Sequence, residues 1–274
     1  MREGALSKKV SRFCMYAFLI VASFISVFPL YWAFISSCNN TQQILGGRMI
    51  PSTHLMENLT KLFAQQDVWR AMKNSFATTL LQVVLSLAVS SIAGYGFEIY
   101  HDKYKDRVMS ILMLAMMVPF VAVLVPLFQM FSKAGLLNSW VGFFLPSLAT
   151  PFLIMYFRNS ARTFPKDTIE AARIDGLNEF QIFIKMFIPM MKPTYASAAT
   201  ITFMNAWNAY LWPKVIMQTP DATTMPMLVS NLMGGYVIDY GVVMAGVTLC
   251  SLPTVIIFFI LQKSFTNGVA GAVK

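Results

Sequence analysis

Residues 13–37 read FCMYAFLIVASFISVFPLYWAFISS, a continuous apolar stretch without a charged side chain. The hydrocarbon core of a bilayer is about 30 Å thick and is crossed by about 20 apolar residues in an α-helix, so this stretch predicts a spanning helix. Spanning segments must bond their backbone N–H and C=O groups internally, and the chain lacks the alternation of a closed β-barrel. An all-α fold with six transmembrane helices is expected, because charge-free runs occur at Phe13–Ser37, Phe76–Phe97, Val108–Ser132, Ala134–Phe157, Pro193–Pro213 and Tyr240–Gln262.

The composition of the whole chain agrees with a membrane location. Of its 274 residues, 57% are hydrophobic and 12% are charged, whereas soluble domains carry about 25% charged residues. This low charge excludes a water-soluble enzyme. The net charge of +9 indicates basic cytoplasmic loops rather than a nucleic-acid partner. The three cysteines have no metal-ligand spacing, so no metal site is expected.

The distribution of basic residues predicts the orientation. With the N-terminus inside, most of the 21 Lys and Arg residues fall on the cytoplasmic segments between the runs, which places both termini in the cytoplasm by the positive-inside rule. A further charge-free stretch, Ala222–Ile238, contains proline and glycines and is expected to be an outer loop or a short interfacial helix. Prolines within the runs should kink or break their helices; these are Pro29, Pro119, Pro126, Pro146 and Pro151.

The N-terminus allows an alternative interpretation. Residues Ile35-Ser36-Ser37-Cys38 are similar to the cleavage box of a bacterial lipoprotein signal. However, the apolar run before them is longer than the 7–15 residues of a signal-peptide core. An uncleaved first spanning helix is therefore favoured.

The longest inner segment, residues 158–192, predicts two short helices joined by a glycine turn. Pro165 suits a first helical turn, and the first helix should continue through Ile169–Ile174. Gly176 can adopt the left-handed conformation that ends a helix. Asn178 is expected to cap the second helix, with Gln181 as its capping-box partner. We term residues 165–189 the elbow.

The side chains of the elbow indicate its partner. In the second helix, which Pro189 should end, one apolar face is expected from Phe180, Phe183, Ile184 and Phe187. The first helix has a small-residue face flanked by Glu170, Arg173 and Asp175, which suits a groove on a cytoplasmic protein. An amphipathic helix resting on lipid headgroups is the alternative, but such helices are rich in Lys and Arg, and the elbow carries four acids.

The elbow resembles a known family motif. The pattern Glu170-Ala171-Ala172-x-x-Asp175-Gly176, followed by Pro189, is similar to the EAA loop of ABC-importer permeases, the coupling helix that sits in a cleft of the ATPase subunit. The segment Trp207–Pro213 and the tail Gly268–Lys274 resemble the MalG-like permease subunits of carbohydrate ABC importers, which are binding-protein-dependent transport system inner membrane components.

The resemblance implies the fold of a type I ABC importer transmembrane domain, in the bacterial cytoplasmic membrane. Its segments would be 1–72 (N-terminal segment, first helix and outer loop), 73–264 (transmembrane core with the coupling loop 158–192) and 265–274 (cytoplasmic Gly-rich tail). It also implies that ATPase coupling involves Glu170, Ala171, Ala172, Arg173, Asp175, Gly176 and Pro189.

The implied partners are a second, non-identical permease subunit, two cytoplasmic ATP-binding subunits, an extracellular solute-binding protein and the lipid bilayer. None of the 14 glycines precedes a lysine, so the chain lacks a P-loop. The chain is therefore expected to be no enzyme and to bind no cofactor, with ATP and Mg²⁺ held by the partner ATPases.

The fifth run suggests the substrate. In a continuous helix Asn205, Asn208 and Trp212 share one face, and Trp207 and Tyr210 lie on another. Amides inside a membrane line a water-filled path or join helices, and aromatic rings with amides suit sugars. Together with the resemblance to carbohydrate importers, this run implies an ATP-driven permease for the uptake of a sugar, and specifically of an oligosaccharide. The alternatives are a permease for glycerol phosphate or a polyol, and an ion-coupled carrier, which would need ionisable residues in its spans.

Overall fold

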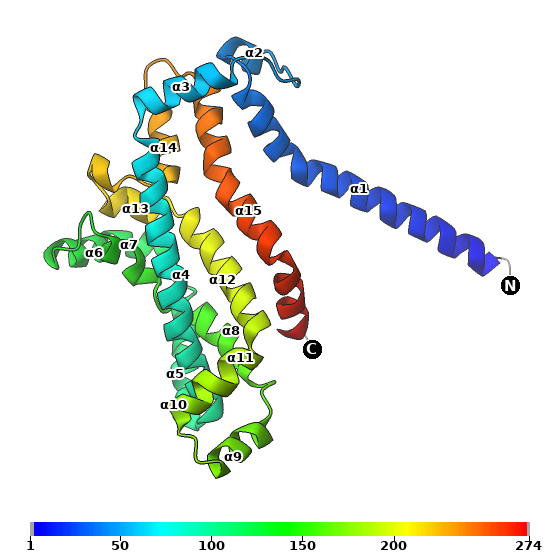
Figure 1. Ribbon diagram of the computed structural model, residues 1–274, viewed down its shortest axis with the longest axis vertical. Helices are drawn as coiled ribbons and strands as arrows, with labels where there is room; N and C mark the ends of the chain where they lie inside the picture. Colours follow the sequence, from blue (N-terminus) through cyan, green and yellow to red (C-terminus); the bar gives the residue numbers. More distant parts are fainter. Residues whose placement is uncertain (1–2, 273–274) are drawn as a thin grey trace. The chain divides into compact units, whose positions relative to one another are not determined.

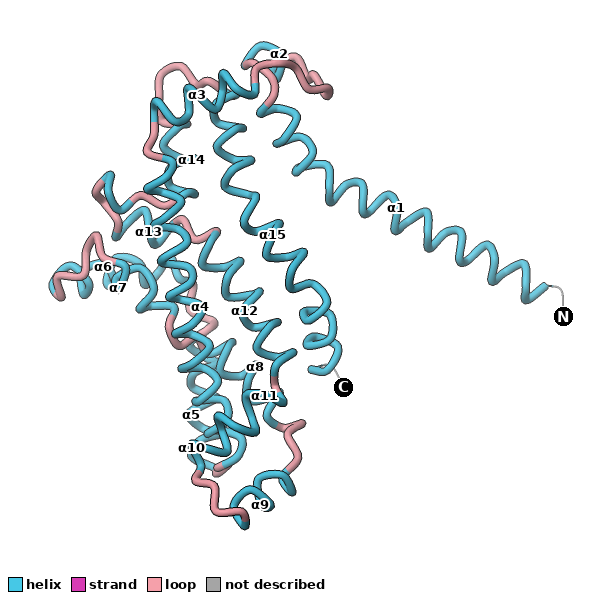
Figure 2. Tube along the Cα trace, in the orientation of Figure 1, coloured by secondary structure: helices cyan, strands magenta, loops and turns pink. Residues whose placement is uncertain are grey.

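The computed structural model describes the backbone of residues 3–272, and this part of the chain is helical, with no β-strand (Figures 1 and 2). Side chains are described for residues 11–262 except Lys166. The all-α prediction is confirmed. The elements are α1 (Glu3–Ser37), α2 (Thr41–Leu45), α3 (Leu55–Gln65), α4 (Val68–Ile99), α5 (Lys103–Ala115), α6 (Phe120–Lys133), α7 (Trp140–Phe144), η1 (Leu145–Ser147), α8 (Pro151–Ala161), α9 (Lys166–Ile174), α10 (Glu179–Ile182), η2 (Phe183–Phe187), α11 (Ile188–Met190), α12 (Lys192–Trp207), α13 (Leu211–Ile216), η3 (Pro220–Ala222), α14 (Met225–Leu232) and α15 (Tyr240–Ala272).

Among the described residues, three uninterrupted helices are long and apolar enough to cross a bilayer. They are α1 over Ser11–Ser37, α4 over Val68–Ile99 and α15 over Tyr240–Gln262, and they coincide with the predicted first, second and sixth runs. The stretch Ala222–Ile238 contains a short helix, α14. The backbone of α15 continues to Ala272, through most of the expected tail, whereas Val273 and Lys274 lie outside the described residues.

The predicted third and fourth runs are not continuous helices. The third consists of α5 and α6, whose axes meet at 100°, and the fourth consists of α7 with η1 and α8, bent by 54°. Pro119 is the N-cap of α6 and Pro151 is the first residue of α8. A proline lacks an N–H and forces the preceding residue out of the helical conformation, so each bend falls at one of these prolines. Counting each bent pair as one span gives up to five candidate spans in the described part of the chain.

The predicted fifth run is also interrupted. Helix α12 ends at Trp207 and α13 starts at Leu211. Pro213 cannot donate a hydrogen bond to the carbonyl of Ala209, which releases the preceding turn. The side-chain amide of Asn208 donates to the carbonyl of Met204 at 2.8 Å. The prediction of one continuous helix over Pro193–Pro213 is therefore wrong.

The chain divides into two compact units, Met1–Asp67 with Val229–Ser251, and Val68–Leu228 with Leu252–Lys274. In the second unit, α4 packs along α8 and α12 (Figure 1). A Cβ atom added at Gly94 of α4 would lie 2.6 Å from the Cβ of Phe157 and 2.7 Å from the backbone nitrogen of Arg158. Small residues let helix backbones approach closely in membranes, so the contact between α4 and α8 requires glycine at this position.

Ion pairs join the end of α4, the start of α5 and the end of α8. Arg158 of α8 is buried and contacts Glu98 of α4 at 3.3 Å and Asp106 of α5 at 2.6 Å. Arg162 contacts the same oxygen of Glu98 at 3.2 Å. Because a buried charge is costly unless paired, this group requires the three helix ends to remain together.

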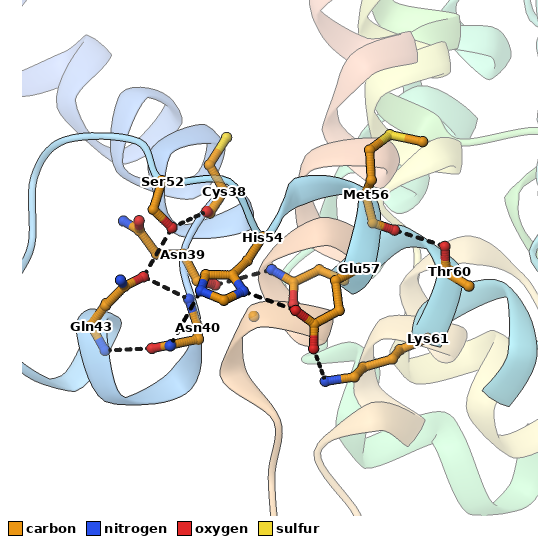
Figure 3. A network of polar contacts seen from close by, with 12 residues as sticks. Cys38, Asn39, Asn40, Gln43, Ser52, His54, Met56, Glu57, Thr60 and Lys61 are labelled. Carbon is orange, nitrogen blue, oxygen red and sulfur yellow. Dashed lines mark hydrogen bonds and ion pairs between the residues drawn. The ribbon is translucent and has the colours of Figure 1, made fainter.

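The first unit is organised by a polar network that follows the end of α1 (Figure 3). The side chain of Asn39 donates to the carbonyl of Ile50 at 3.1 Å. The side chain of Asn58 in α3 donates to the carbonyls of Ser37 and Asn39, at 2.8 and 3.0 Å. The Asn58 amide thus bonds to carbonyl groups at and just beyond the end of α1, where the helix leaves carbonyls without a helical partner.

Charged residues extend this network. Glu57 lies 2.8 Å from His54 and 2.7 Å from Lys61 (Figure 3). Hydrogen bonds from Lys61 and then from His54 lower the pKa of Glu57 to about 2. Lys61 also approaches Asp239 at 3.6 Å. Asp239 accepts hydrogen bonds from the hydroxyl of Thr41 and from the backbone N–H of Gly241, both at 3.1 Å.

Two glycines in α4 provide a test of its packing. Gly94→Ala should destabilise the protein by about 1–3 kcal/mol, because the added methyl group meets backbone atoms of α8. Gly96→Ala is the matched control, since no described neighbour lies within 4 Å of its added Cβ. The melting temperature of the purified protein should fall for the first variant only. Equal melting temperatures would show that α4 and α8 are not in close contact.

Candidate functional site

The first arm of the elbow is α9, and a left-handed glycine ends it. Gly176 has φ +80°, and its N–H donates to the carbonyl of Arg173 at 3.1 Å. The N–H of Leu177 donates to the carbonyl of Ala172 at 3.0 Å. These two bonds form a Schellman motif. The predicted helix end at Gly176 is confirmed. Glycine is required here by the positive φ angle and not by a lack of space, because a Cβ atom at this position meets no described neighbour within 4 Å.

The second arm starts with the predicted capping box. The N–H of Gln181 donates to Asn178 Oδ1 at 2.9 Å, and the N–H of Asn178 donates to Gln181 Oε1 at 3.0 Å. An ion pair joins the two arms, since Arg173 Nε lies 2.8 Å from Glu179 Oε1. The Arg173 guanidinium holds the pKa of Glu179 below its usual value. The elbow therefore has its own local bonds on both sides of Gly176.

Pro189 does not end the second helix, contrary to the sequence-based prediction. It lies inside α11, after the π-helical turn η2. The N–H of Ile188 donates to the carbonyl of Phe183, five residues back. Pro189 has no N–H to donate to Lys185, and the wide turn accommodates this missing bond. The chain then continues almost directly into α12.

Both arms bury apolar residues against the ends of α4 and α8. Ile169 and Ala172 of α9 and Ile182, Phe183 and Phe187 of the second arm belong to one buried cluster with Tyr95 of α4. The expected single apolar face is only partly correct. Phe180 is 67% exposed and Ile184 is exposed as well, whereas Phe183 and Phe187 are buried.

The opposite face of α9 is open to solvent. Of the predicted coupling residues, only Ala172 is buried, while Glu170, Ala171, Arg173, Asp175, Gly176 and Pro189 are exposed. Ile174 lies among them and is 87% exposed. This exposed face, which we call the outer face of α9, combines acids, an alanine and one uncovered isoleucine. Such a pattern suits docking to another protein.

A cavity of about 260 Å³ lies in the second unit between α4, the break before α8, and α12 with α13. None of the described residues that line it is charged. Its lining consists of Gln82, Ser86, Phe143, Ser147, Thr150, Phe152, Leu153, Ile201, Thr202, Asn205, Ala209, Trp212 and Pro213.

Two of the five predicted path residues line this cavity, Asn205 and Trp212. The indole N–H of Trp212 donates to the carbonyl of Gly142 at 3.0 Å, which fixes the ring. Trp207 is buried elsewhere, with its ring 4.8 Å from that of Phe76. Asn208 and Tyr210 fall in the break between α12 and α13 and are not lining residues. The break thus separates residues that a continuous helix would have placed together.

The other polar residues that line the cavity were not identified in the sequence analysis. Gln82 and Ser86 are four residues apart in α4, and buried Thr78 and Ser90 extend this polar stripe by one turn in each direction. Such a stripe in an apolar helix is a readable signal for a face toward other helices or a cavity. Ser147 and Thr150 were not identified as lining residues, although they lie between Pro146 and Pro151, where a kink or break of the helix was expected.

Comparison with known families identifies the chain. Residues 96–271 match the family described as binding-protein-dependent transport system inner membrane component. The chain belongs to this family. Members of the binding-protein-dependent inner membrane components are transporter components, so the chain is not an enzyme. The elbow and the cavity both lie at least partly within the matched residues, since the match starts near the end of α4.

Individual members of the family align over nearly the whole chain. The lactose transport system permease protein LacG of Rhizobium radiobacter is 42% identical over 98% of this chain and 98% of its own length. The arabinooligosaccharides transport system permease protein AraQ of Halalkalibacterium halodurans is 33% identical over 92% of each chain.

The fold also matches a solved transporter. A chain of a bacterial ABC transporter involved in the import of the acidic polysaccharide alginate superposes with a TM-score of 0.83, covering 94% of this chain and 98% of that chain. At 21% sequence identity this similarity concerns the fold. The chain therefore has the fold of an ABC transporter membrane domain.

The ion pair of the elbow predicts a pH dependence. Glu179 has a lowered pKa in the folded state, so its stabilising contribution is complete above the ordinary carboxyl pKa and is lost as the pH falls through the lowered value. Amide exchange at Gly176 and Leu177, corrected for the intrinsic rate, should be constant near pH 6 and rise below about pH 4. In Glu179→Gln this rise should be absent. A rise of the same size in that variant would assign it to other groups.

Proposed function

We propose that the chain is a membrane-spanning permease subunit of an ATP-driven uptake system for neutral sugars, in particular oligosaccharides. The uncharged polar cavity carries this proposal. Its amide and hydroxyl groups, such as those of Gln82, Thr202 and Asn205, can bond sugar hydroxyls, and the ring of Trp212 can cover an apolar sugar surface. LacG and AraQ, whose names refer to lactose and arabinooligosaccharides, agree with this substrate class.

The cavity argues against the alternatives. Transport of a phosphorylated solute such as glycerol phosphate favours cationic groups along the path, and no described lining residue supplies one. An ion-coupled carrier would place ionisable residues within its spans, and the six runs contain none.

The elbow supplies the coupling in this proposal. Without a P-loop the chain depends on two partner ATPases, which bind ATP and Mg²⁺. The outer face of α9 docks into a cleft of one ATPase through Glu170, Ala171 and Ile174. When the ATPases close, the elbow moves with them, and its buried side pulls on the inner ends of α4 and α8. Such rigid-body motions convert between two packed states.

The proposed membrane topology has six spans with both termini in the cytoplasm. Counting α12 with α13 as one broken span adds a sixth to the five candidates. The positions of the basic residues support the elbow on the cytoplasmic side. A second, non-identical permease subunit would complete the path, and a solute-binding protein would deliver the substrate from outside.

Uptake by the reconstituted complex tests the proposed function directly. Membrane vesicles with this chain, its companion permease, the ATPases and the solute-binding protein should accumulate a labelled neutral oligosaccharide, such as lactose. Uptake should require ATP and be inhibited by vanadate. Glycerol 3-phosphate and alginate oligosaccharides serve as comparison substrates. Accumulation of either in preference to every neutral saccharide would overturn the assignment.

Substitutions on the outer face of α9 should weaken the ATPase contact. For Glu170→Lys and Ile174→Ser we expect at least a tenfold loss of ATPase co-purification, because exposed anchors at an interface contribute more than about 1 kcal/mol each. Thermal stability should not change, since both side chains are exposed. Leu45→Ser, at a 70% exposed leucine in the other unit, is the control. Normal ATPase binding by both elbow variants would refute the coupling role.

Two asparagines near the end of α12 allow a residue of the proposed substrate path to be compared with a structural residue. Asn205 lines the cavity, whereas the amide of Asn208 is bonded to the backbone of α12. Asn205→Ala should lower the rate of sugar uptake about tenfold, the equivalent of one or two lost hydrogen bonds. Asn208→Ala should retain most of the uptake. Equal rates in Asn205→Ala and the wild type would remove Asn205 from the path.

A further inference from the structure

The polar side chains that line the cavity differ in what already binds them. Two of them, Ser86 and Trp212, donate to backbone carbonyls of the cavity wall at 3.1 and 3.0 Å. Gln82 of α4 and Thr202 of α12 line the same cavity. Neither of these two side chains has a hydrogen-bond partner among the residues that the structure describes. Their amide and hydroxyl groups are therefore available to a ligand.

Burial separates these two side chains from bulk solvent. Gln82 is 7% exposed and Thr202 is 8% exposed. Asn205, which lines the cavity as well, is exposed, so solvent can satisfy its amide. A buried polar group without a partner is costly, and native structures rarely retain one without a reason. Because Gln82 and Thr202 line the cavity, their partners must be molecules that occupy it.

A neighbouring threonine shows the bond that Thr202 does not make. Thr200 is buried in the same helix and donates to the carbonyl of Ala196, four residues earlier, at 2.8 Å. Such a bond to the helix backbone is a common way to satisfy a hydroxyl. Other unbonded hydroxyls, such as that of Thr79, are fully enclosed and cannot meet a ligand. The polar atoms of Gln82 and Thr202 are not enclosed in this way, because they open onto the cavity.

We propose that Gln82 and Thr202 are the specificity-determining residues of the cavity, and that they select neutral sugars with two adjacent free hydroxyls. This proposal rests on the proposed function, because it takes the cavity as part of the sugar path. An amide offers one carbonyl acceptor and two N–H donors, so the side chain of Gln82 can bond two neighbouring hydroxyls of one sugar ring. Thr202, on the other helix, adds a hydroxyl that both donates and accepts.

Competition with water gives the two residues their selectivity. A polar cavity of about 260 Å³ is roomy enough for ordered water when no sugar is bound. A sugar hydroxyl donates and accepts as water does, so it replaces the bonds of the water that it displaces. A deoxy position displaces the water but leaves Gln82 or Thr202 unpaired. A site built to bond a hydroxyl rejects an analogue that lacks it for this reason.

Gln82→Met replaces the amide by an apolar side chain of similar length and tests the selection. The reconstituted complex is supplied with its best neutral saccharide, lactose being tested first, and with the monodeoxy derivatives of that sugar. For at least one deoxy position, the ratio of sugar uptake to derivative uptake should be about tenfold lower in the variant than in the wild type. The parent sugar loses a bond to Gln82 in the variant, whereas the derivative has none to lose. The same solute-binding protein serves both complexes, so its own preference cancels from the comparison.

Thr202→Val and Thr200→Val form a matched pair two positions apart in α12. Thr202→Val should lower uptake of the parent sugar about fivefold, the effect of one hydrogen bond. Its melting temperature should not fall, because the hydroxyl has no bond within the described protein to lose. Thr200→Val should retain wild-type uptake and selectivity. Its melting temperature should fall by about 2–4 °C, because it loses the bond to Ala196.

The uptake ratio separates substrate contact from a structural role. An unchanged ratio in Gln82→Met at every deoxy position would overturn the inference even if total uptake fell, because a structural residue affects all sugars alike. Wild-type uptake in both Gln82→Met and Thr202→Val would overturn it as well, and either result would leave the proposed function standing. A wild-type complex that prefers glycerol 3-phosphate or alginate oligosaccharides to every neutral saccharide would refute the proposed function itself, and the selection with it.

Discussion

The close approach of α4 to α8 is the contact on which both candidate sites depend. It brings Gly94 against Phe157 with no room for a Cβ atom, and it places Arg158 within reach of Glu98. Toward one end of α4, this packing sets Gln82 and Ser86 at the cavity. Toward the other end, it presents Tyr95 to the elbow. A single helix thus lines the candidate substrate site and receives the elbow.

Features that depend on neighbouring residues could be predicted from the sequence. The capping box of Asn178 with Gln181 and the turn at Gly176 were predicted because a few adjacent residues determine them. The uninterrupted helices followed from length and apolarity alone. Pro189 was assigned wrongly, since a proline can be accommodated by a wide turn as well as by a helix end. Local sequence does not distinguish these two outcomes, because packing of the flanking phenylalanines decides between them.

The cavity could be predicted only in part. Asn205 and Trp212 were identified by residue type, but the break between α12 and α13 changes which residues they face. Ser147 and Thr150 reach the cavity only because the chain bends by 54° before α8. Bends of this kind expose backbone carbonyls and polar side chains inside an apolar protein, where they are tolerated next to a cavity. The interruptions before α8 and between α12 and α13 are therefore the features that make the cavity polar.

The bond between Thr41 and Asp239 has a consequence for biosynthesis. Asp239 accepts from Thr41 and from the first N–H groups of α15, and the two residues are 198 positions apart in the chain. A ribosome makes Thr41 long before Asp239, at about 5–20 residues per second. The loop after the first helix consequently lacks its bonds to Asp239 until the last helix has been synthesised and inserted. A truncated chain that lacks α15 would expose this unfinished loop to quality-control proteases.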